Sequence, residues 1–314
     1  MKIVVTGALG HIGSRLIREL PTTFKDAEIY MIDNMLTQRY CSLFNLPSGV
    51  NYRFLEGDVL TLDMEKILTG AQVVIHLAAI TDAAASFEKR ELVESVNHNA
   101  TLRVAEACLK TGCAMFHISS TSVYGTQAEV VDEDCPESDL QPQSPYAETK
   151  LKEERLLQEL GSKGLRFMIA RFGTISGVSP GIRFHTAVNK FCWQAVLGQP
   201  LTVWRTAMHQ KRPYLELGDA VDAVKFVIQN DLFDRRVYNV LTNNHTVDQI
   251  VNMIKAHVPS LKIEYVDTKI MNQLSYDVSN QRFSKAGFNP KGSLEGSISQ
   301  TVSLLSGVGS ALDD

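Results

Sequence analysis

Cysteine is scarce in this 314-residue chain, which has five: Cys41, Cys108, Cys113, Cys135 and Cys192. Their number is odd and none belongs to a C-x-x-C pair, so neither a disulfide framework nor a structural zinc site is expected. His185, His209 and His245 are too dispersed to suggest another metal site. We therefore expect a reduced, cytoplasmic protein without a bound metal.

Long apolar runs and an excess of one charge are also missing. No stretch approaches the ~18 uninterrupted apolar residues that suggest a membrane helix, and the start of the chain lacks an apolar signal region. The net charge is −4, so neither a nucleic acid nor an anionic membrane is an expected partner. The length suits one large α/β unit, or a main domain with a smaller lobe.

Strand-like apolar runs alternate with helical patterns in the first half of the chain. The predicted strands are residues 3–5, 29–32, 51–55, 72–77, 115–119 and 165–170, and helices are predicted after residue 13 and over 62–68, 87–110 and 146–160. The first helix is expected to stop at Pro21, because proline lacks the N–H that a helix interior needs. This alternation predicts a Rossmann-type doubly wound parallel sheet.

A glycine-rich turn follows the first strand. Gly7 permits a tight turn, Gly10 allows a ligand to approach the backbone closely, and Gly13 allows the helix to pack closely on the strand. The spacing is G-x-x-G-x-x-G, so an ordinary βα turn is the alternative. The second strand, however, ends in Asp33, where a carboxylate can accept hydrogen bonds from ribose hydroxyls and repel a 2′-phosphate. This context predicts NAD rather than NADP, with a degenerate or mononucleotide site as the alternative.

The alternation weakens after Gly173, where glycine- and proline-containing loops separate shorter elements. Helices are expected over residues 184–197 and 247–257. We therefore divide the chain into an NAD-binding Rossmann domain, residues 1–172, and a mainly substrate-binding lobe, residues 173–314. Some segments of the second part are expected to return to the main domain.

Tyr146 and Lys150 are four residues apart on a predicted helix, so they share one face of it. A neighbouring ammonium favours the phenolate form of a tyrosine, which can then act as a base. The spacing alone is common on solvated helices, and its meaning depends on the surrounding motifs.

Together these motifs resemble the extended short-chain dehydrogenase/reductase family, in its branch of nucleotide-sugar epimerases and dehydratases. The similarity extends from residue 1 to about residue 304. The matching motifs are residues 6–13, Asp33-Asn34, Gly57-Asp58-Val59, His76-Leu77-Ala78-Ala79, residues 97–101, 119–125 and 144–150, Arg171-Phe172-Gly173, Arg212-Pro213-Tyr214 and Gly218-Asp219-Ala220.

The resemblance implies a role for each matching residue. Tyr146 would be the general base and acid on a sugar hydroxyl, normally at C4; Lys150 would hold the nicotinamide ribose, and Ser120 would hydrogen-bond the same sugar oxygen. The implied NAD-binding residues are Gly7, Gly10, His11, Ile12, Gly13, Asp33, Asn34, Asp58, Val59, Leu77, Ala78, Ala79, Asn97, Ser119, Tyr146 and Lys150. The implied substrate-binding residues are Thr81, Ser120, Thr121, Tyr146, Thr174, Arg183, Asn189 and Arg212.

Two of the implied substrate-binding residues, Arg212 and Thr174, concern the diphosphate of the substrate. Arg212 would contact the diphosphate, which a guanidinium suits well, and a solvated surface charge is the alternative. Thr174 stands where many relatives carry an asparagine near the diphosphate.

Positions at which this chain differs from the family pattern disfavour some of the family's reactions. The sugar 4,6-dehydratases carry an Asp-Glu pair where this chain has Thr121 and Ser122, and the related decarboxylases usually carry a glutamate at the position of Ser122. These departures favour an NAD-dependent nucleotide-sugar 4-epimerase. A 4-dehydrogenase or 4-ketoreductase is the alternative, because residues 176–183 resemble a branch acting on heptoses. A non-catalytic NAD-sensing protein is the alternative from another class.

The family often pairs two helices across a two-fold axis into a four-helix bundle. The corresponding helices here are predicted over residues 87–110 and 146–160. The resemblance therefore implies a homodimer, which a monomer in solution would refute.

Overall fold

A seven-stranded parallel sheet forms the centre of the protein, and the predicted doubly wound fold is confirmed. The structure is a computed structural model and describes residues 1–81, 85–125, 129–267 and 275–308. The strand order is β11-β7-β5-β4-β1-β2-β3. The strands are β1 (Lys2–Thr6), β2 (Glu28–Asp33), β3 (Asn51–Glu56), β4 (Val73–His76), β5 (Ala114–Ser120), β7 (Phe167–Phe172) and β11 (Val237–Val240).

Helices cover both faces of this sheet, because successive strand side chains point to opposite faces. Within β1, for example, Ile3 and Val5 join one buried cluster and Val4 joins the other. The first cluster lies under α1 (His11–Thr23), α6 (Leu217–Gln229) and α8 (Gln281–Lys285). The second lies under α2 (Met64–Leu68), α3 (Arg90–Thr111) and α4 (Pro145–Ser162).

Helix α1 continues through Pro21 and ends at Thr23, so the prediction that it stops at the proline is wrong. Proline cannot donate to the carbonyl oxygen of Ile17, four residues earlier. The Tyr52 hydroxyl donates to that oxygen instead, at 2.7 Å. A side chain from β3 thus replaces the missing helical hydrogen bond.

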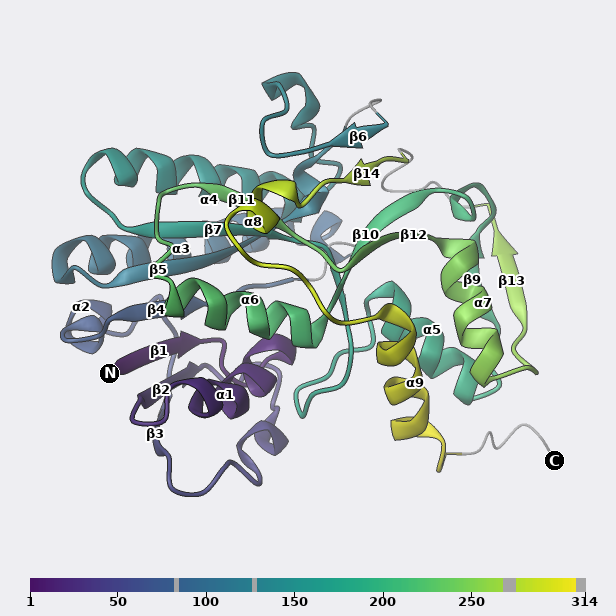
Figure 1. Cartoon of the computed structure of the whole chain (residues 1–314), viewed down its shortest axis with the longest axis horizontal. Helices are drawn as coiled ribbons and strands as arrows, with labels where there is room; N and C mark the ends of the chain where they lie inside the picture. Colours follow the sequence, from purple (N-terminus) through teal and green to yellow (C-terminus); the bar gives the residue numbers. More distant parts are fainter. Residues whose placement is uncertain (82–84, 126–128, 268–274, 309–314) are drawn as a thin grey trace.

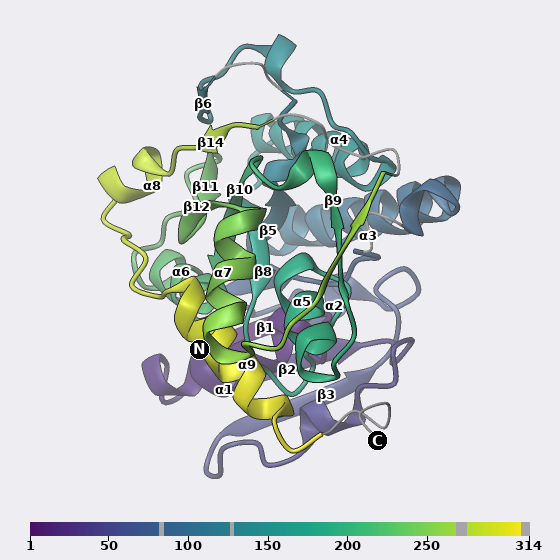
Figure 2. The same ribbon diagram turned by 90° about the vertical axis from the view of Figure 1, so that its right-hand side faces the viewer.

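A smaller lobe packs against one end of the sheet (Figures 1 and 2). Its elements surround a separate apolar cluster that includes Val188, Leu201 and Ile254. They are the sheet β12 (Asn243–Thr246), β10 (Lys211–Glu216) and β8 (Thr174–Ser176), the pair β13 (Ile263–Val266) and β9 (Leu201–Trp204), and the helices α5 (Ala187–Val196), α7 (Val247–His257) and α9 (Leu294–Leu305). A further strand pair joins β6 (Val130–Val131) to β14 (Asp277–Val278).

The second half of the chain also contributes to the main sheet. After β8, β9 and β10 have formed parts of the lobe, α6 packs against α1, and β11 pairs with β7. The two halves of the chain are therefore interleaved. Within the described residues, no helix has the length and apolar character needed to cross a membrane.

Candidate active site

The glycine-rich turn between β1 and α1 has the shape of a phosphate cradle. Gly7 has φ +65°, and a Cβ there would lie 2.7 Å from the Ala78 nitrogen; a Cβ on Gly13 would lie 2.5 Å from the Gly7 oxygen. Both positions therefore require glycine. Gly10 is the N-cap of α1 and has no side chain to cap it, so the first N–H groups of the helix can bind a pyrophosphate.

Acidic side chains lie next to this turn, at the carboxyl ends of β2 and β3. Asp33 accepts hydrogen bonds from the Leu9 nitrogen on Oδ2 and from the Met35 nitrogen on Oδ1, each at 3.0 Å. Asn34 donates to Asp58 Oδ2 at 3.0 Å. Since a carboxylate offers about four lone-pair sites, Asp33 can hold the turn and still accept bonds from ribose hydroxyls. This geometry fits the adenosine half of a dinucleotide.

The role of Asp33 in choosing NAD can be tested with Asp33→Asn. The amide keeps an acceptor for the Leu9 N–H but removes the charge that repels a 2′-phosphate. We expect the ratio of the dissociation constants for NADP and NAD to fall about tenfold, which corresponds to roughly 1.4 kcal/mol. Calorimetric titration with both cofactors measures this ratio. The exposed Asp26→Asn is the matched control, and an unchanged ratio in Asp33→Asn would show that Asp33 does not discriminate.

Helix α4 presents Tyr146 and Lys150 at the carboxyl edge of the sheet. Ser144 caps the helix by accepting a hydrogen bond from the Ala147 nitrogen at 3.2 Å, and Pro145 occupies the first turn. Tyr146, in that first turn, is partly buried. The Lys150 Nζ lies 5.8 Å from the centroid of the Tyr146 ring. The predicted pair therefore shares one side of the helix.

Ser120 ends β5 and caps the short 3-10 helix η3 (Thr121–Val123), against which α4 packs. Its Oγ lies 2.8 Å from the Ser122 Oγ. Thr121 is buried and donates to the Phe172 oxygen at 3.3 Å. The structure thus brings Ser120 to the N-terminal part of α4, whereas the Thr121 hydroxyl is occupied inside the protein.

Two buried glutamates on α4 were missed by the sequence analysis. Lys150 Nζ lies 2.9 Å from Glu153 Oε2. Burial lowers the pKa of Lys150, but Glu153, Tyr146 and Glu154 together outweigh burial, so that the pKa lies above its usual value. Lys150 is therefore an ammonium at neutral pH. The available signal was two carboxylates placed three and four residues after Lys150, where a helix returns to the same face.

Glu154 binds Arg171 of β7 through two hydrogen bonds, from Nε at 2.9 Å and from Nη2 at 2.7 Å. Ser119, predicted to contact NAD, is buried and donates to Glu154. Arg171 also donates to the Tyr124 hydroxyl at 2.8 Å, which in turn donates to Asn239 at 2.9 Å. This network ties α4 to β5, β7 and β11 behind the tyrosine.

The side chains of Thr6 and Asn97 hold the loop after β4, which contains the predicted NAD-binding residues Leu77 and Ala78. Leu77 and Ala78 donate their backbone N–H groups to Thr6 Oγ1 at 3.2 and 3.3 Å. Asn97 binds both the nitrogen and the oxygen of Ile80, at 2.8 and 2.9 Å. Their contacts with NAD remain predictions.

The predicted substrate residues meet where the lobe approaches the sheet. Arg183 donates to Thr81, and Asn189 accepts from the Gly177 nitrogen at 3.2 Å and donates to the Arg183 oxygen at 3.0 Å. Asn189 is fully buried and braces this loop. His11 reaches the same loop through a 2.8 Å contact of Nε2 with the Gly177 oxygen.

Two further substrate residues lie on the lobe's three-stranded sheet. Thr174 of β8 is opposite Tyr214 of β10, and Arg212 is two residues before Tyr214, on the same face of its strand. Arg212 donates to Gln210 Oε1 at 2.8 Å. Substrate contacts of both residues stay predictions.

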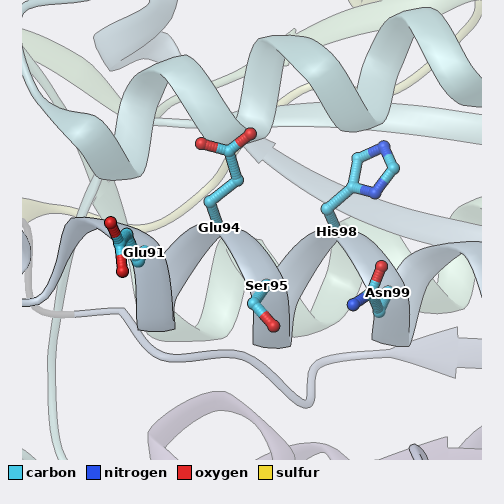
Figure 3. A pocket seen from close by; sticks show the side chains of 5 residues that line it. All are labelled: Glu91, Glu94, Ser95, His98 and Asn99. Atoms are coloured by element: carbon cyan, nitrogen blue, oxygen red, sulfur yellow. The ribbon is translucent and has the colours of Figure 1, made fainter.

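A surface hollow lies on α3. It is lined by Glu91, Glu94, Ser95, His98 and Asn99, and Figure 3 shows Glu94 and His98 directed toward the neighbouring helix. Ion pairs join α3 to α4 here: Lys152 Nζ lies 2.5 Å from Glu94, and Arg90 Nη1 lies 2.7 Å from Glu148. The resemblance places a partner subunit on these two helices, and the homodimer stays a prediction.

The described residues contain no group of three or more His, Cys, Asp or Glu side chains placed to hold a metal ion.

The glycine-rich turn, the acidic pair beside it and the tyrosine–lysine pair define a dinucleotide-dependent enzyme of the Rossmann type. The chain matches the model of the NAD dependent epimerase/dehydratase family over residues 3–240, and it belongs to that family. Its cofactor is NAD, and the resemblance inferred from the motifs is confirmed. The alternative of a non-catalytic NAD-sensing protein is set aside, since the family and its characterised neighbours are enzymes.

The curated relatives include both epimerases and dehydratases. An uncharacterised UDP-glucose epimerase of Bacillus subtilis is 32% identical over 238 residues, covering 73% of this chain and 72% of the relative. A trifunctional UDP-glucose 4,6-dehydratase/UDP-4-keto-6-deoxy-D-glucose 3,5-epimerase/UDP-4-keto-L-rhamnose-reductase of Arabidopsis thaliana is 28% identical over 96% of this chain. The chain spans only 46% of that plant protein's length.

Solved structures of similar chains contain nucleotide sugars. A UDP-glucuronic acid 4-epimerase from Bacillus cereus, in complex with UDP-glucuronic acid and NAD, aligns with a TM-score of 0.84 at 25% identity, covering 97% of this chain and 99% of the other. A UDP-N-acetylglucosamine 4-epimerase from Methanobrevibacter ruminantium aligns with a TM-score of 0.82 at 25% identity, covering 96% and 97%.

Proposed function

We propose that this protein is an NAD-dependent nucleotide-sugar 4-epimerase. The observation that carries the proposal is the combination of Ser120, Tyr146 and Lys150 with hydroxyl side chains at positions 121 and 122. A 4,6-dehydratase needs an acid and a base to eliminate water, and two alcohols cannot supply them at neutral pH. Thr121 is moreover directed to the Phe172 oxygen, and Ser122 to Ser120.

The residues of the site suit reversible oxidation at a sugar hydroxyl. Tyr146 takes the hydroxyl proton and later returns it, and Ser120 hydrogen-bonds the same oxygen. Lys150 holds the nicotinamide ribose, and its ammonium lies 5.8 Å from the centroid of the Tyr146 ring. Bound NAD would supply the acceptor for the hydride that leaves the sugar carbon and the donor that returns it, and return to the opposite face of the ketone inverts that carbon. Because the proton and the hydride both return to the sugar, the cofactor is unchanged after each turnover.

A UDP-sugar is the substrate class that we propose. Both 4-epimerase neighbours described above were solved with UDP-linked sugars, and the epimerase relative is named for UDP-glucose. In this chain, Arg212 is the residue proposed to bind the diphosphate, since a guanidinium can bind two phosphate oxygens at once. Thr174 lies close to it on the neighbouring strand.

The proposal is tested by incubating the purified protein with UDP-, dTDP-, GDP- and CDP-sugars and resolving the products. We expect the C4 epimer of at least one UDP-sugar to form without added oxidant. The absorbance of reduced cofactor should show no net change during turnover. Formation of a 4-keto-6-deoxy sugar would contradict the proposal and point to dehydration.

A 4-dehydrogenase or 4-ketoreductase is the second candidate. It is favoured by residues 176–183, which resemble a branch that includes sugar-nucleotide 4-dehydrogenases acting on heptoses. Asn189 binds this loop at Gly177 and Arg183. The distinguishing signal of this candidate is stoichiometric: each sugar converted would reduce or oxidise one cofactor. The same incubation therefore separates the two candidates.

A further inference from the structure

A row of polar side chains crosses the sheet directly below the cofactor edge. Thr6 of β1 is opposite His76 of β4, which is opposite His117 of β5. All three are buried, on the face of the sheet that α3 and α4 cover. Their last neighbour is Glu153 of α4, so the row ends at the partner of Lys150.

The two histidines of this row, His76 and His117, are neutral. Thr6 Oγ1 accepts from the Leu77 and Ala78 nitrogens, so its own hydrogen is available to His76 Nδ1, 2.8 Å away. Burial lowers the pKa of His76 to about 3, and burial also lowers the pKa of His117. Both imidazoles are therefore neutral at neutral pH. The His117 and His76 rings stack with centroids 6.1 Å apart.

Glu153 is shared between His117 and Lys150. Its Oε2 lies 3.1 Å from His117 Nε2 and 2.9 Å from Lys150 Nζ. The histidine contact is too bent for a full hydrogen bond, and within the described chain Glu153 Oε1 has no hydrogen-bond partner. Burial raises the pKa of Glu153, but Lys150 and His117 outweigh it and lower the pKa to about 2. Glu153 is thus a fully buried, ionised and incompletely bonded carboxylate.

The presence of this buried carboxylate is poorly explained by a contribution to the stability of the fold. A buried ion pair is often no more stabilising than an apolar pair of similar volume, because both charges lose their hydration. Its geometry suggests another use. An ammonium has three N–H donors. One of them binds Glu153, one turn further along α4, and this bond fixes the position of the ammonium relative to Tyr146, whose ring centroid lies 5.8 Å from Nζ.

The charges around the ammonium come from three elements. Tyr146, Glu153 and Glu154 face it from α4, His117 from β5 and His76 from β4. With both histidines neutral, Glu153 is the anion in direct contact with Lys150. Glu154 is bound by Arg171 in addition.

We propose that Glu153 is a positioning residue that fixes the Lys150 ammonium and balances its charge next to the nicotinamide. The inference rests on the proposed function only through the contact of Lys150 with the cofactor ribose. NAD⁺ carries a positive charge on its nicotinamide ring that NADH lacks. Glu153 therefore permits the oxidised cofactor to bind beside a permanent cation.

Glu153→Gln tests the balancing of charge. Glu153 follows Tyr146 by seven positions on α4, a rise of about 10 Å, which sets the scale of the distance from the Glu153 charge to a nicotinamide beside Tyr146. A unit charge at that distance changes an equilibrium roughly tenfold at an effective dielectric constant of about 20. We expect the affinity for NAD⁺ to fall roughly tenfold relative to that for NADH, measured by calorimetric titration of cofactor-free protein. Glu148→Gln is the control: this carboxylate lies on the same helix but is partly exposed and paired with Arg90, so solvent and the arginine screen its charge and the ratio should change far less.

Glu153→Asp tests the positioning separately and keeps the charge. Its carboxylate is one methylene shorter, so we expect both cofactors to bind about threefold more weakly with their ratio preserved. This variant also decides the question if Glu153→Gln does not fold. An unchanged NAD⁺/NADH ratio in folded Glu153→Gln, or wild-type affinity for both cofactors in Glu153→Asp, would overturn the inference.

Neither titration contains a sugar. A protein that epimerises no sugar but shows both shifts would refute the proposed function and leave the role of Glu153 intact. A protein that epimerises UDP-sugars and shows neither shift would refute the role of Glu153 and leave the proposed function intact.

Discussion

Tyr146→Phe is expected to lower kcat by about a thousandfold or more. General acid–base catalysis contributes typically 10²–10⁴-fold, and in the mechanism that we propose Tyr146 is the group that takes the proton from the sugar hydroxyl. The substitution removes one oxygen atom from a partly buried ring and leaves Lys150 and Glu153 in place. The affinity for NAD should therefore change less than about threefold. Conversion of the nucleotide sugar and calorimetric binding of NAD measure the two quantities.

Tyr30→Phe is the matched control for this prediction. Tyr30 lies in the middle of β2, on the strand that leads to Asp33, and its ring is covered by Lys2. Both activity and NAD binding should stay at the wild-type level. If Tyr146→Phe converted the sugar as fast as Tyr30→Phe does, Tyr146 would not be the base.

Arg171→Met should be the most destabilising of these substitutions. Methionine approximates the length of the side chain but leaves the Glu154 carboxylate buried without its bidentate partner. Breaking a buried ion pair in this way costs about 3–5 kcal/mol. For a chain of this size the melting temperature should fall on the order of 10 °C, which thermal unfolding followed by circular dichroism measures.

Arg166→Met provides the comparison for an exposed pair. Arg166, just before β7, contacts both Asp231 oxygens at 2.6 and 2.7 Å, but its side chain is 45% exposed. An exposed pair contributes less than about 1 kcal/mol, so the melting temperature should hardly change. Equal effects of the two substitutions would mean that the Glu154–Arg171 pair is not a main support of the site.

Local sequence signals were sufficient for much of the fold. The glycine-rich turn, the strand ending in Asp33 and the helix carrying Tyr146 each combine a strong apolar pattern with a specific turn or cap. Helix α7 was predicted with its observed bounds, Val247–His257, and in the structure Thr246 and Gln249 form a capping box at its start.

Other features depend on contacts that local patterns do not contain. Helix α5 begins at Ala187, three residues after the predicted start at Phe184, and the Phe184 ring instead packs on Trp193 with centroids 5.1 Å apart. The strand β8 has three residues, too few for a periodic pattern. Glu153 could be placed on the face of its helix, but its pairing with His117 depends on how α4 lies across β5.

The strand order has a consequence for the synthesis of this protein. A nascent chain released only as far as Phe172 has formed β7 but not β11, so the outer edge of the sheet has unpaired backbone groups. The apolar face that α6 covers is exposed at the same stage. The ribosome must then add the first strands and helix of the lobe before either surface is protected, so this interval is when the growing chain is most open to aggregation and to capture by chaperones.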